Sequence, residues 1–163
     1  MDVKNKNSFT FMNFRKAGLV ITIVLVAAIF LLNRKDVTLA KQDNFELNAV
    51  STTGAEFKSV IHLHNPNLLS STIKIIDEKF SINGIQIAQL SIDMSQGIPG
   101  LKETAFPVSV RFSKEDYYNA VRTDSTMSEN AEVLIEGEIN FENLTGNGTI
   151  KIHQTETIAV KDL

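Results

Sequence analysis

The sequence predicts an all-β fold: a seven-stranded antiparallel β-sandwich with one short helix, preceded by a single N-terminal transmembrane helix. Three observations carry this prediction. From residue 44 onward, apolar and polar residues alternate with period two, the pattern of half-buried strands. Turn-forming residues separate the alternating runs. Before them lies one uncharged, mostly apolar run, Ala17 to Leu32, between basic residues.

The apolar run predicts an uncleaved membrane anchor. Its 16 residues span roughly 24 Å as a helix, somewhat less than the ~30 Å of the hydrocarbon core. Two basic residues flank each end of the run, namely Arg15, Lys16, Arg34 and Lys35. Their long side chains can make up the difference by reaching toward the lipid headgroups.

Two alternatives exist for this segment. A cleaved signal peptide is one, because Thr38-Leu39-Ala40 is a tolerable small-x-small site, although the charges of Arg34 and Lys35 directly after the apolar run disfavour cleavage. A buried core helix is disfavoured because the run is not amphipathic. A slight excess of Lys and Arg before the run predicts a cytoplasmic N-terminus over residues 1–16 and a folded domain on the periplasmic or cell-surface side.

The alternating runs form one domain over residues 44–163, joined to the anchor by a linker over 33–43. Asn83-Gly84 joins two of the runs and predicts a hairpin, because a type I′ turn needs positive φ at both central positions. The seven expected strands cover residues 44–50, 55–65, 71–82, 85–92, 102–112, 131–143 and 148–160.

One helix is expected within residues 112–123. Ser113 is a good N-cap, and Asp116 stands at the third helical position, as in a capping box. Phe112 and Tyr117 have the spacing of a hydrophobic staple.

The sixth strand, "EVLIEGEINFE", predicts which side chains form the core. Its alternation places Ile135 and Ile139 on the inward face. The outward face carries Glu132, Glu136, Glu138 and Glu142.

The tripeptide Asn65-Pro66-Asn67 ends the second strand. Pro66 has no N–H and holds its φ at about −65°, so it cannot lie inside a central strand. Asn67 can adopt turn conformations and hydrogen-bond its local backbone. We interpret the tripeptide as a structural turn that redirects the chain and needs no ligand.

Three segments in this order, "VIHLHNPN" (60–67), "FSINGIQIAQ" (80–89) and "TAFPVSVRFS" (104–113), resemble the late embryogenesis abundant (LEA) type 2 family, which carries the water-stress and hypersensitive-response (WHy) domain. The resemblance covers residues 45–160 and suggests a bacterial, membrane-anchored member. It implies a small fibronectin-III-like sandwich with one helix, no catalytic site, and an association with desiccation and other stress.

The composition argues against several kinds of functional site and binding partner. The 163 residues include no cysteine, which excludes a disulfide framework and a thiolate zinc site. The net charge is -3, but residues 1–35 hold six basic residues against Asp2, and the rest holds 10 basic and 18 acidic residues. An acidic folded part argues against nucleic acid and against a domain lying on anionic lipid.

The histidines and acidic pairs are the remaining candidates. His62 and His64 share one face of a strand and could bind zinc only with a third ligand, so we interpret them as solvent-facing polar residues. The pair Asp77-Glu78 points to opposite faces of a strand, and Glu115-Asp116 suits a first helical turn. No catalytic sequence motif is present.

We therefore expect a non-enzymatic, membrane-anchored WHy-type protein that protects the cell envelope under desiccation or other stress by binding or shielding. No catalytic, metal-binding or cofactor-binding residues are expected, and no nucleic acid or small-molecule substrate. The membrane is the expected partner, with an envelope protein as a second candidate. One alternative is an accessory or adaptor subunit of an envelope complex that uses the sandwich as an interaction module. An enzyme with an unfamiliar site is the other.

Overall fold

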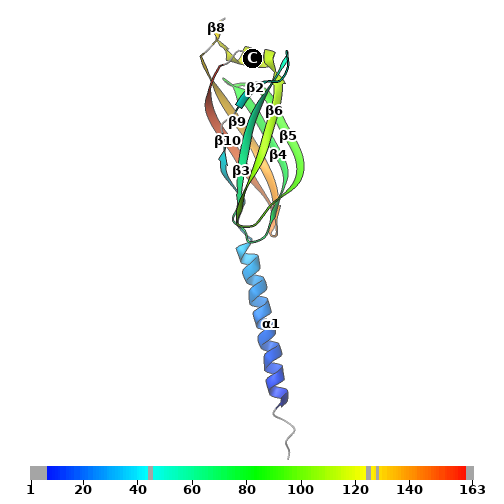
Figure 1. Ribbon diagram of the computed structural model, residues 1–163. Helices are drawn as coiled ribbons and strands as arrows, with labels where there is room; N and C mark the ends of the chain where they lie inside the picture. Colours follow the sequence, from blue (N-terminus) through cyan, green and yellow to red (C-terminus); the bar gives the residue numbers. More distant parts are fainter. Residues whose placement is uncertain (1–6, 44–45, 124–125, 128, 161–163) are drawn as a thin grey trace, which may run out of the picture.

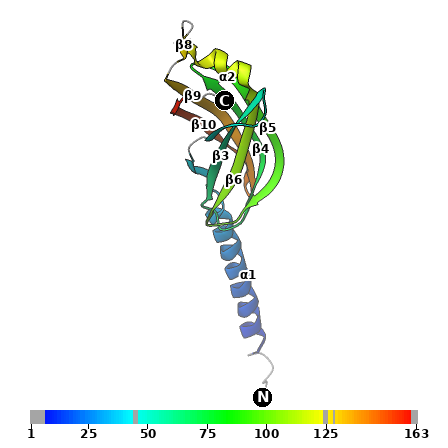
Figure 2. The ribbon, with the colours of Figure 1, turned by 45° about the horizontal axis from the view of Figure 1, so that its top comes forward.

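The computed structural model describes residues 7–43, 46–123, 126–127 and 129–160, and the side chains of these residues except 7–18, 123 and 126–127. Helix α1 (Asn7–Leu32) projects from one end of a β-sandwich, and helix α2 (Lys114–Val121) lies across the opposite end (Figures 1 and 2). Two antiparallel sheets form the sandwich between these helices.

Sheet A is built around β3. Strand β6 pairs with β3 along its whole length, and strands β1 and β2 share the other edge of β3. The strands of sheet A are β1 (Thr38–Gln42), β2 (Glu46–Ala49), β3 (Gly54–Asn65) and β6 (Lys102–Ser113).

Sheet B has the order β10-β9-β4-β5, and all its neighbours are antiparallel. Its strands are β4 (Ser71–Ile82), β5 (Ile85–Ile98), β9 (Asn130–Asn143) and β10 (Gly146–Ala159). After α2 the chain forms a small ribbon of β7 (Arg122–Thr123) and β8 (Thr126–Met127).

The two sheets contain eight strands, so the expected count of seven is wrong. The additional strand is β1, which lies in the segment expected to be a linker. Backbone pairing with β3 forms this strand: Leu39 lies opposite Leu63, and Gln42 lies opposite Ile61. A short edge strand of this kind needs no alternation of apolar residues, and the sequence therefore gives little sign of it.

The core lies between the inward faces of the two sheets. Ile135 and Ile139 of β9 are fully buried. The four glutamates of this strand are exposed, which confirms the two faces expected from its alternation. Phe57 of β3 and Phe80 of β4 stack across the sandwich with ring centroids 6.4 Å apart.

Helix α2 begins at the N-cap that its sequence predicts, although the cap hydrogen bond comes from Glu115 and not from Asp116 of the expected capping box. Ser113 is the N-cap, and its Oγ accepts a hydrogen bond from the backbone N–H of Glu115 at 3.0 Å. The rings of Phe112 and Tyr117 lie 6.3 Å apart by centroid, so the two residues pack together as a hydrophobic staple would. This contact holds α2 against the end of the sandwich.

The Asn83-Gly84 turn between β4 and β5 lies at the same end as α2. Asn83 has a φ of 47° and Gly84 a φ of 81°, as a type I′ turn requires. The Asn83 side chain also donates to the carbonyl of Ala120 and accepts from the N–H of Glu132, both at 3.0 Å. The turn asparagine therefore joins the end of α2 to the start of β9.

The sequence predicts a membrane-spanning helix over residues 17–32. Within the ranges described above, no helix is both long enough and apolar enough to cross a membrane.

Substitutions on the two faces of β9 should have very different costs. Ile139→Ala should lower the free energy of unfolding by ~2–5 kcal/mol, because it leaves a cavity between the sheets. The neighbouring change Glu138→Ala should cost less than about 0.5 kcal/mol, because its side chain is exposed. Urea denaturation of the full chain in detergent, followed by far-UV circular dichroism, measures both. Equal costs would contradict the assignment of the two faces.

Candidate functional site

Asn33 is the first residue after α1 and is buried where the helix meets the sandwich. Its Nδ2 donates to the carbonyl of Ile29 at 2.6 Å, and its Oδ1 accepts from the backbone N–H of Leu69 at 2.6 Å. The hydroxyl of Thr145 lies 3.4 Å from the Asn33 carbonyl oxygen. Asn33 thus satisfies a carbonyl at the end of α1 and ties the helix to two loops of the sandwich.

Asn67 continues this connection by binding Lys35, which lies two residues after Asn33. Its Oδ1 accepts from the backbone N–H of Lys35 at 3.0 Å, and its Nδ2 donates to the Lys35 carbonyl at 2.8 Å. One side-chain amide therefore pairs with both backbone groups of Lys35, as a neighbouring strand would. The segment leaving α1 is held by Asn67 before β1 begins.

The Asn65 side chain hydrogen-bonds to Asn67, and all of its donors and acceptors are used. Its Oδ1 accepts from the backbone N–H of Asn67 at 3.0 Å and from Asn67 Nδ2 at 2.9 Å. Its Nδ2 donates to the carbonyls of Leu69 at 3.0 Å and Ile98 at 2.9 Å. Both asparagines are buried, so the tripeptide Asn65-Pro66-Asn67 does more than end β3: it organises the junction between helix and sandwich.

We call Asn33, Asn65 and Asn67 the junction asparagines. Arg34 and Lys35, two of the basic residues expected to flank a membrane, are exposed beside them. The side chains of the other two, Arg15 and Lys16, lie outside the described part of the structure. The junction therefore combines a buried polar centre with a basic surface.

His62 lies between two carboxylates on sheet A. Its Nδ1 is 2.9 Å from Glu103 Oε1, and its Nε2 is 3.0 Å from Asp43 Oδ2. Both contacts are hydrogen bonds at once only when both ring nitrogens carry a proton. Hydrogen bonds from Lys41 and then from His62 hold the pKa of Asp43 below its usual value. His62 thus joins Asp43 and Glu103 in a chain of polar contacts on sheet A.

The described geometry does not support a zinc site at His62 and His64. In the described part of the chain, no group of three or more His, Cys, Asp or Glu side chains is placed to hold a metal ion. His153, the third histidine, lies on β10, where its Nδ1 is 3.2 Å from Glu136 Oε1.

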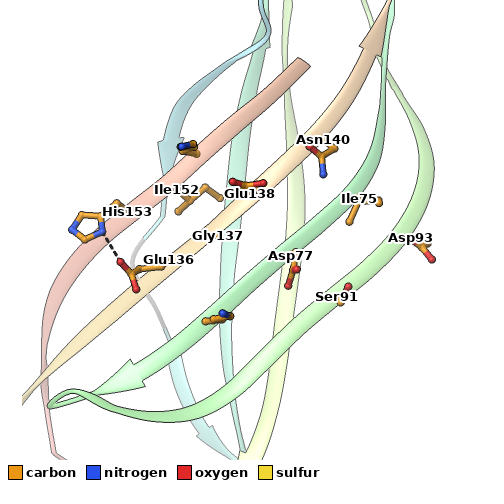
Figure 3. A pocket seen from close by; sticks show the side chains of 12 residues that line it. Ile75, Asp77, Ser91, Asp93, Glu136, Gly137, Glu138, Asn140, Ile152 and His153 are labelled. Carbon is orange, nitrogen blue, oxygen red and sulfur yellow. Dashed lines mark hydrogen bonds and ion pairs between the residues drawn. The ribbon is translucent and has the colours of Figure 1, made fainter. Parts of the chain in front are cut away.

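A shallow hollow of about 680 Å³ lies on the outer face of sheet B, and Figure 3 shows the side chains that line it. All four strands of the sheet contribute to it. Its charged and titratable lining residues are Asp77, Lys79, Asp93, Glu136, Glu138, Lys151 and His153. More of these groups are acidic than basic, so the hollow is an acidic surface open to water.

Solved structures of other proteins resemble this chain. An Arabidopsis thaliana protein solved in solution matches with a TM-score of 0.64 and 19% identity, over 78% of this chain and 82% of that chain. A second solution structure, provisionally described as an LEA protein, matches at 0.59 and 18%, over 91% and 88% of the two chains. A crystal structure from Archaeoglobus fulgidus matches at 0.58 and 11%, over 77% and 100%. No protein-family model and no curated protein sequence matches the chain.

The sandwich has an LEA-like fold, because it resembles the structure provisionally described as an LEA protein. The expected resemblance to LEA proteins is therefore confirmed for the fold alone, which is what a likeness at 18% identity shows.

The core of the LEA-like sandwich contains a glutamate, Glu78, to which the sequence analysis assigned no special role. Glu78 on β4 points inward with Ile76 and Phe80, and its side chain is fully buried. Among the described residues, neither of its carboxylate oxygens has a hydrogen-bond partner. Burial raises the pKa of Glu78 to about 7. A signal was present, because Glu78 occupies an inward position in the alternation of this strand.

Gly137 on β9 lies opposite Glu78 and makes room for it. A Cβ on Gly137 would collide first with the Asp77 carbonyl oxygen, and it would also lie 2.9 Å from Glu78 Cα and 3.0 Å from Glu78 Cγ. A side chain at this position would therefore displace either the carboxyl group or the strand. Glycine inside a strand often marks such a close approach.

Asn67→Ala should loosen the junction. The change leaves the backbone N–H of Lys35 without its partner, and the Lys35 carbonyl keeps the longer contact with Asn143 Nδ2 at 3.5 Å. A buried unsatisfied group costs ~1–3 kcal/mol. The free energy of unfolding should fall by a similar amount, ~1–3 kcal/mol. Trypsin should also cut faster after Arg34 and Lys35, because their backbone is no longer held. Asn147→Ala, at an exposed hairpin asparagine, is the matched control and should change neither measurement. Identical tryptic rates in the two variants would contradict the role of Asn67.

Glu78 should make stability depend on pH. The unfolded chain releases this proton near its ordinary pKa of 4.5, whereas the folded chain holds it to about pH 7. Folding therefore takes up a proton between these values, so the free energy of unfolding should fall as the pH rises through this window and then level off. The total fall is on the order of 3 kcal/mol, at 1.36 kcal/mol per pKa unit.

Glu78→Gln removes the titrating group and should remove this part of the pH dependence. It should match the parent chain at pH values near 4.5 and be the more stable of the two above neutrality. Glu138→Gln, at an exposed glutamate on the neighbouring strand, is the control and should follow the parent at every pH. Parallel urea-denaturation profiles for the parent and Glu78→Gln would show that Glu78 does not hold its proton in the folded state.

Proposed function

We propose that this chain is a non-enzymatic, single-pass membrane protein of the WHy type, whose folded domain lies outside the cytoplasm and protects the cell envelope under desiccation or other stress. The observation that supports it most is the junction: an apolar helix continues directly into an LEA-like sandwich and is fastened to it by buried asparagines.

The surface of α1 supports the anchor. From residue 19 to the end of the helix, its large apolar side chains are exposed on every side. They are Leu19, Val20, Ile21, Ile23, Val24, Leu25, Val26, Ile29, Phe30, Leu31 and Leu32. A helix that is apolar all round is stable when it is surrounded by protein or by lipid, and the sandwich contacts it at its end alone. We propose that lipid surrounds α1. Because no described helix is long and apolar enough to cross a membrane by itself, the proposal requires the basic residues that flank the apolar run to complete the span by reaching toward the headgroups.

The chemistry of the polar groups supports a role without catalysis. In the most elaborate polar arrangement, the junction asparagines, the Asn65 side chain is saturated by contacts within the chain, and both N–H groups of the Asn67 amide are paired as well. These groups serve the structure and are not available to a substrate. Binding or shielding would then act through the outer surface of the sandwich.

The alternative, an accessory subunit of an envelope complex, draws support from the acidic hollow on sheet B. Its mixture of four carboxylates with Lys79, Lys151 and His153 could pair with a basic protein surface. Under this alternative the sandwich is an interaction module.

Cells that express the full chain should survive drying better than cells that express a chain beginning at Asn33, which keeps the junction asparagines and lacks α1. The full chain should stay with membranes after carbonate washing, and the shorter chain should be soluble.

His62→Ala should protect as well as the parent, with His153→Ala as the matched control, because neither histidine performs chemistry in this proposal. Survival counts, cell fractionation and melting curves provide the measurements.

Each part of the proposal has its own contrary result. Release of the full chain by carbonate would overturn the anchor. Loss of protection by a His62→Ala variant that melts normally would overturn the non-enzymatic role. A stoichiometric partner purified with the chain from detergent would favour the accessory subunit.

A further inference from the structure

Four leucines are exposed at the end of the sandwich from which α1 emerges. Leu68 and Leu69 follow β3, Leu101 lies between β5 and β6, and Leu144 lies between β9 and β10. Their exposed fractions are 47%, 43%, 62% and 52%. Outside α1, the described residues include two other exposed large apolar side chains, Val50 and Ile85. We call the four leucines the leucine collar.

The junction asparagines hold the collar loops around the end of α1. The backbone N–H of Leu69 donates to Asn33 Oδ1, and the N–H of Leu101 donates to the Asn67 carbonyl at 2.9 Å. The Thr145 hydroxyl, next to Leu144, lies 3.4 Å from the Asn33 carbonyl oxygen. Figures 1 and 2 show the three loops gathered where the helix leaves the sandwich.

Leu101 is held outward in a backbone conformation that leucine rarely adopts. Its φ is 56°, in the left-handed region where a Cβ crowds the backbone. A glycine at position 101 would avoid this strain. The neighbouring Gly100 is required for a different reason, because a Cβ there would collide with the Leu68 carbonyl oxygen. A strained residue that exposes an apolar side chain indicates a role for that side chain.

We propose that the leucine collar is a second membrane contact, in which the four leucines enter the boundary between headgroups and acyl chains around the point where α1 leaves the bilayer. The inference rests on the proposed anchor. Leu69 of the collar donates its N–H to Asn33, one residue after the end of α1. Leu101 donates to the carbonyl of Asn67, whose side chain is bonded to Lys35, three residues after the end of α1. The collar therefore lies at the depth where the helix leaves the hydrocarbon.

Length supports lipid as the occupant of this surface. The uncharged run of 16 residues spans roughly 24 Å, and the hydrocarbon core is ~30 Å thick. The collar adds apolar surface at the end of the helix where the run stops. It continues the apolar surface of α1 instead of standing apart from it.

Charge supports the same occupant. Arg34, Lys35 and Lys102 are exposed beside the collar, where they can meet lipid phosphates, and they outnumber the exposed acidic residues Asp36 and Glu103 of the same segments. The outer face of sheet B is acidic, so an anionic bilayer would repel the side of the sandwich and accept its collar end. The domain should therefore stand upright on the membrane.

Tryptophan fluorescence can test the collar, because the chain contains no tryptophan. Four single-tryptophan variants of the full chain are needed. Leu101→Trp and Leu144→Trp report on the collar, and Leu25→Trp reports on α1. Ile85→Trp, at an exposed residue beside the Asn83-Gly84 turn, is the matched control at the far end of the sandwich. All four positions are exposed, and circular dichroism checks that each variant folds.

Each variant is placed in vesicles of phosphatidylcholine and phosphatidylglycerol, with phosphatidylcholine brominated near either the carbonyl or the methyl end of its acyl chain. Both collar variants should lose fluorescence, most strongly with the shallow bromines, and their emission should shift to the blue. Leu25→Trp should lose most with the deep bromines. Ile85→Trp should lose nothing with either lipid.

The outcomes separate the collar from the anchor. Quenching of Leu25→Trp without quenching of Leu101→Trp and Leu144→Trp would overturn the collar, leave the anchor in place and direct attention to a protein that covers the leucines. No quenching of Leu25→Trp would overturn the anchor and the collar together. Equal quenching of Ile85→Trp and the collar variants would mean that the sandwich lies flat, which also overturns the collar.

Discussion

The hydrogen bonds of two buried asparagines, Asn65 and Asn67, are the interaction on which the rest of the structure depends. Each amide is out of water, so every donor and acceptor left unpaired would cost free energy. Their partners come from segments far apart in the sequence, at Lys35, Leu69 and Ile98. The requirement to pair these groups fixes the loops at one end of the sandwich and the direction in which the chain leaves α1.

Local sequence patterns predict the elements that are stabilised locally. The alternation of β9, the Ser113 cap and the Phe112–Tyr117 contact each depend on residues a few positions apart, and each can be recognised in the sequence. Strand β1 and the junction depend on pairing between residues 19 to 112 positions apart, for which a single sequence contains no signal. The Asn-Pro-Asn turn could be recognised in the sequence because it depends on neighbouring residues. The contacts of its asparagine side chains could not, because most of their partners are distant in the sequence.

Glu78 shows a different limit. Both relevant facts are local, since the alternation of β4 turns Glu78 inward and Gly137 interrupts the apolar face of β9. What the sequence does not show is that these two positions lie opposite each other. Register turns a glycine and a glutamate that look unrelated into one feature: a core carboxyl group, without a partner among the described residues, whose protonation depends on pH near neutrality.

The position of β1 has a mechanical consequence. β1 follows the junction at once and runs away from α1 along β3, so a force that draws the helix away from the sandwich would act along the axis of the strand. The hydrogen bonds between β1 and β3 would then be loaded together in shear and would not open one after another. If α1 is the membrane anchor that we propose, the pull of a moving or bending membrane would act first on the junction asparagines and then on the whole length of β1, before it reaches the core.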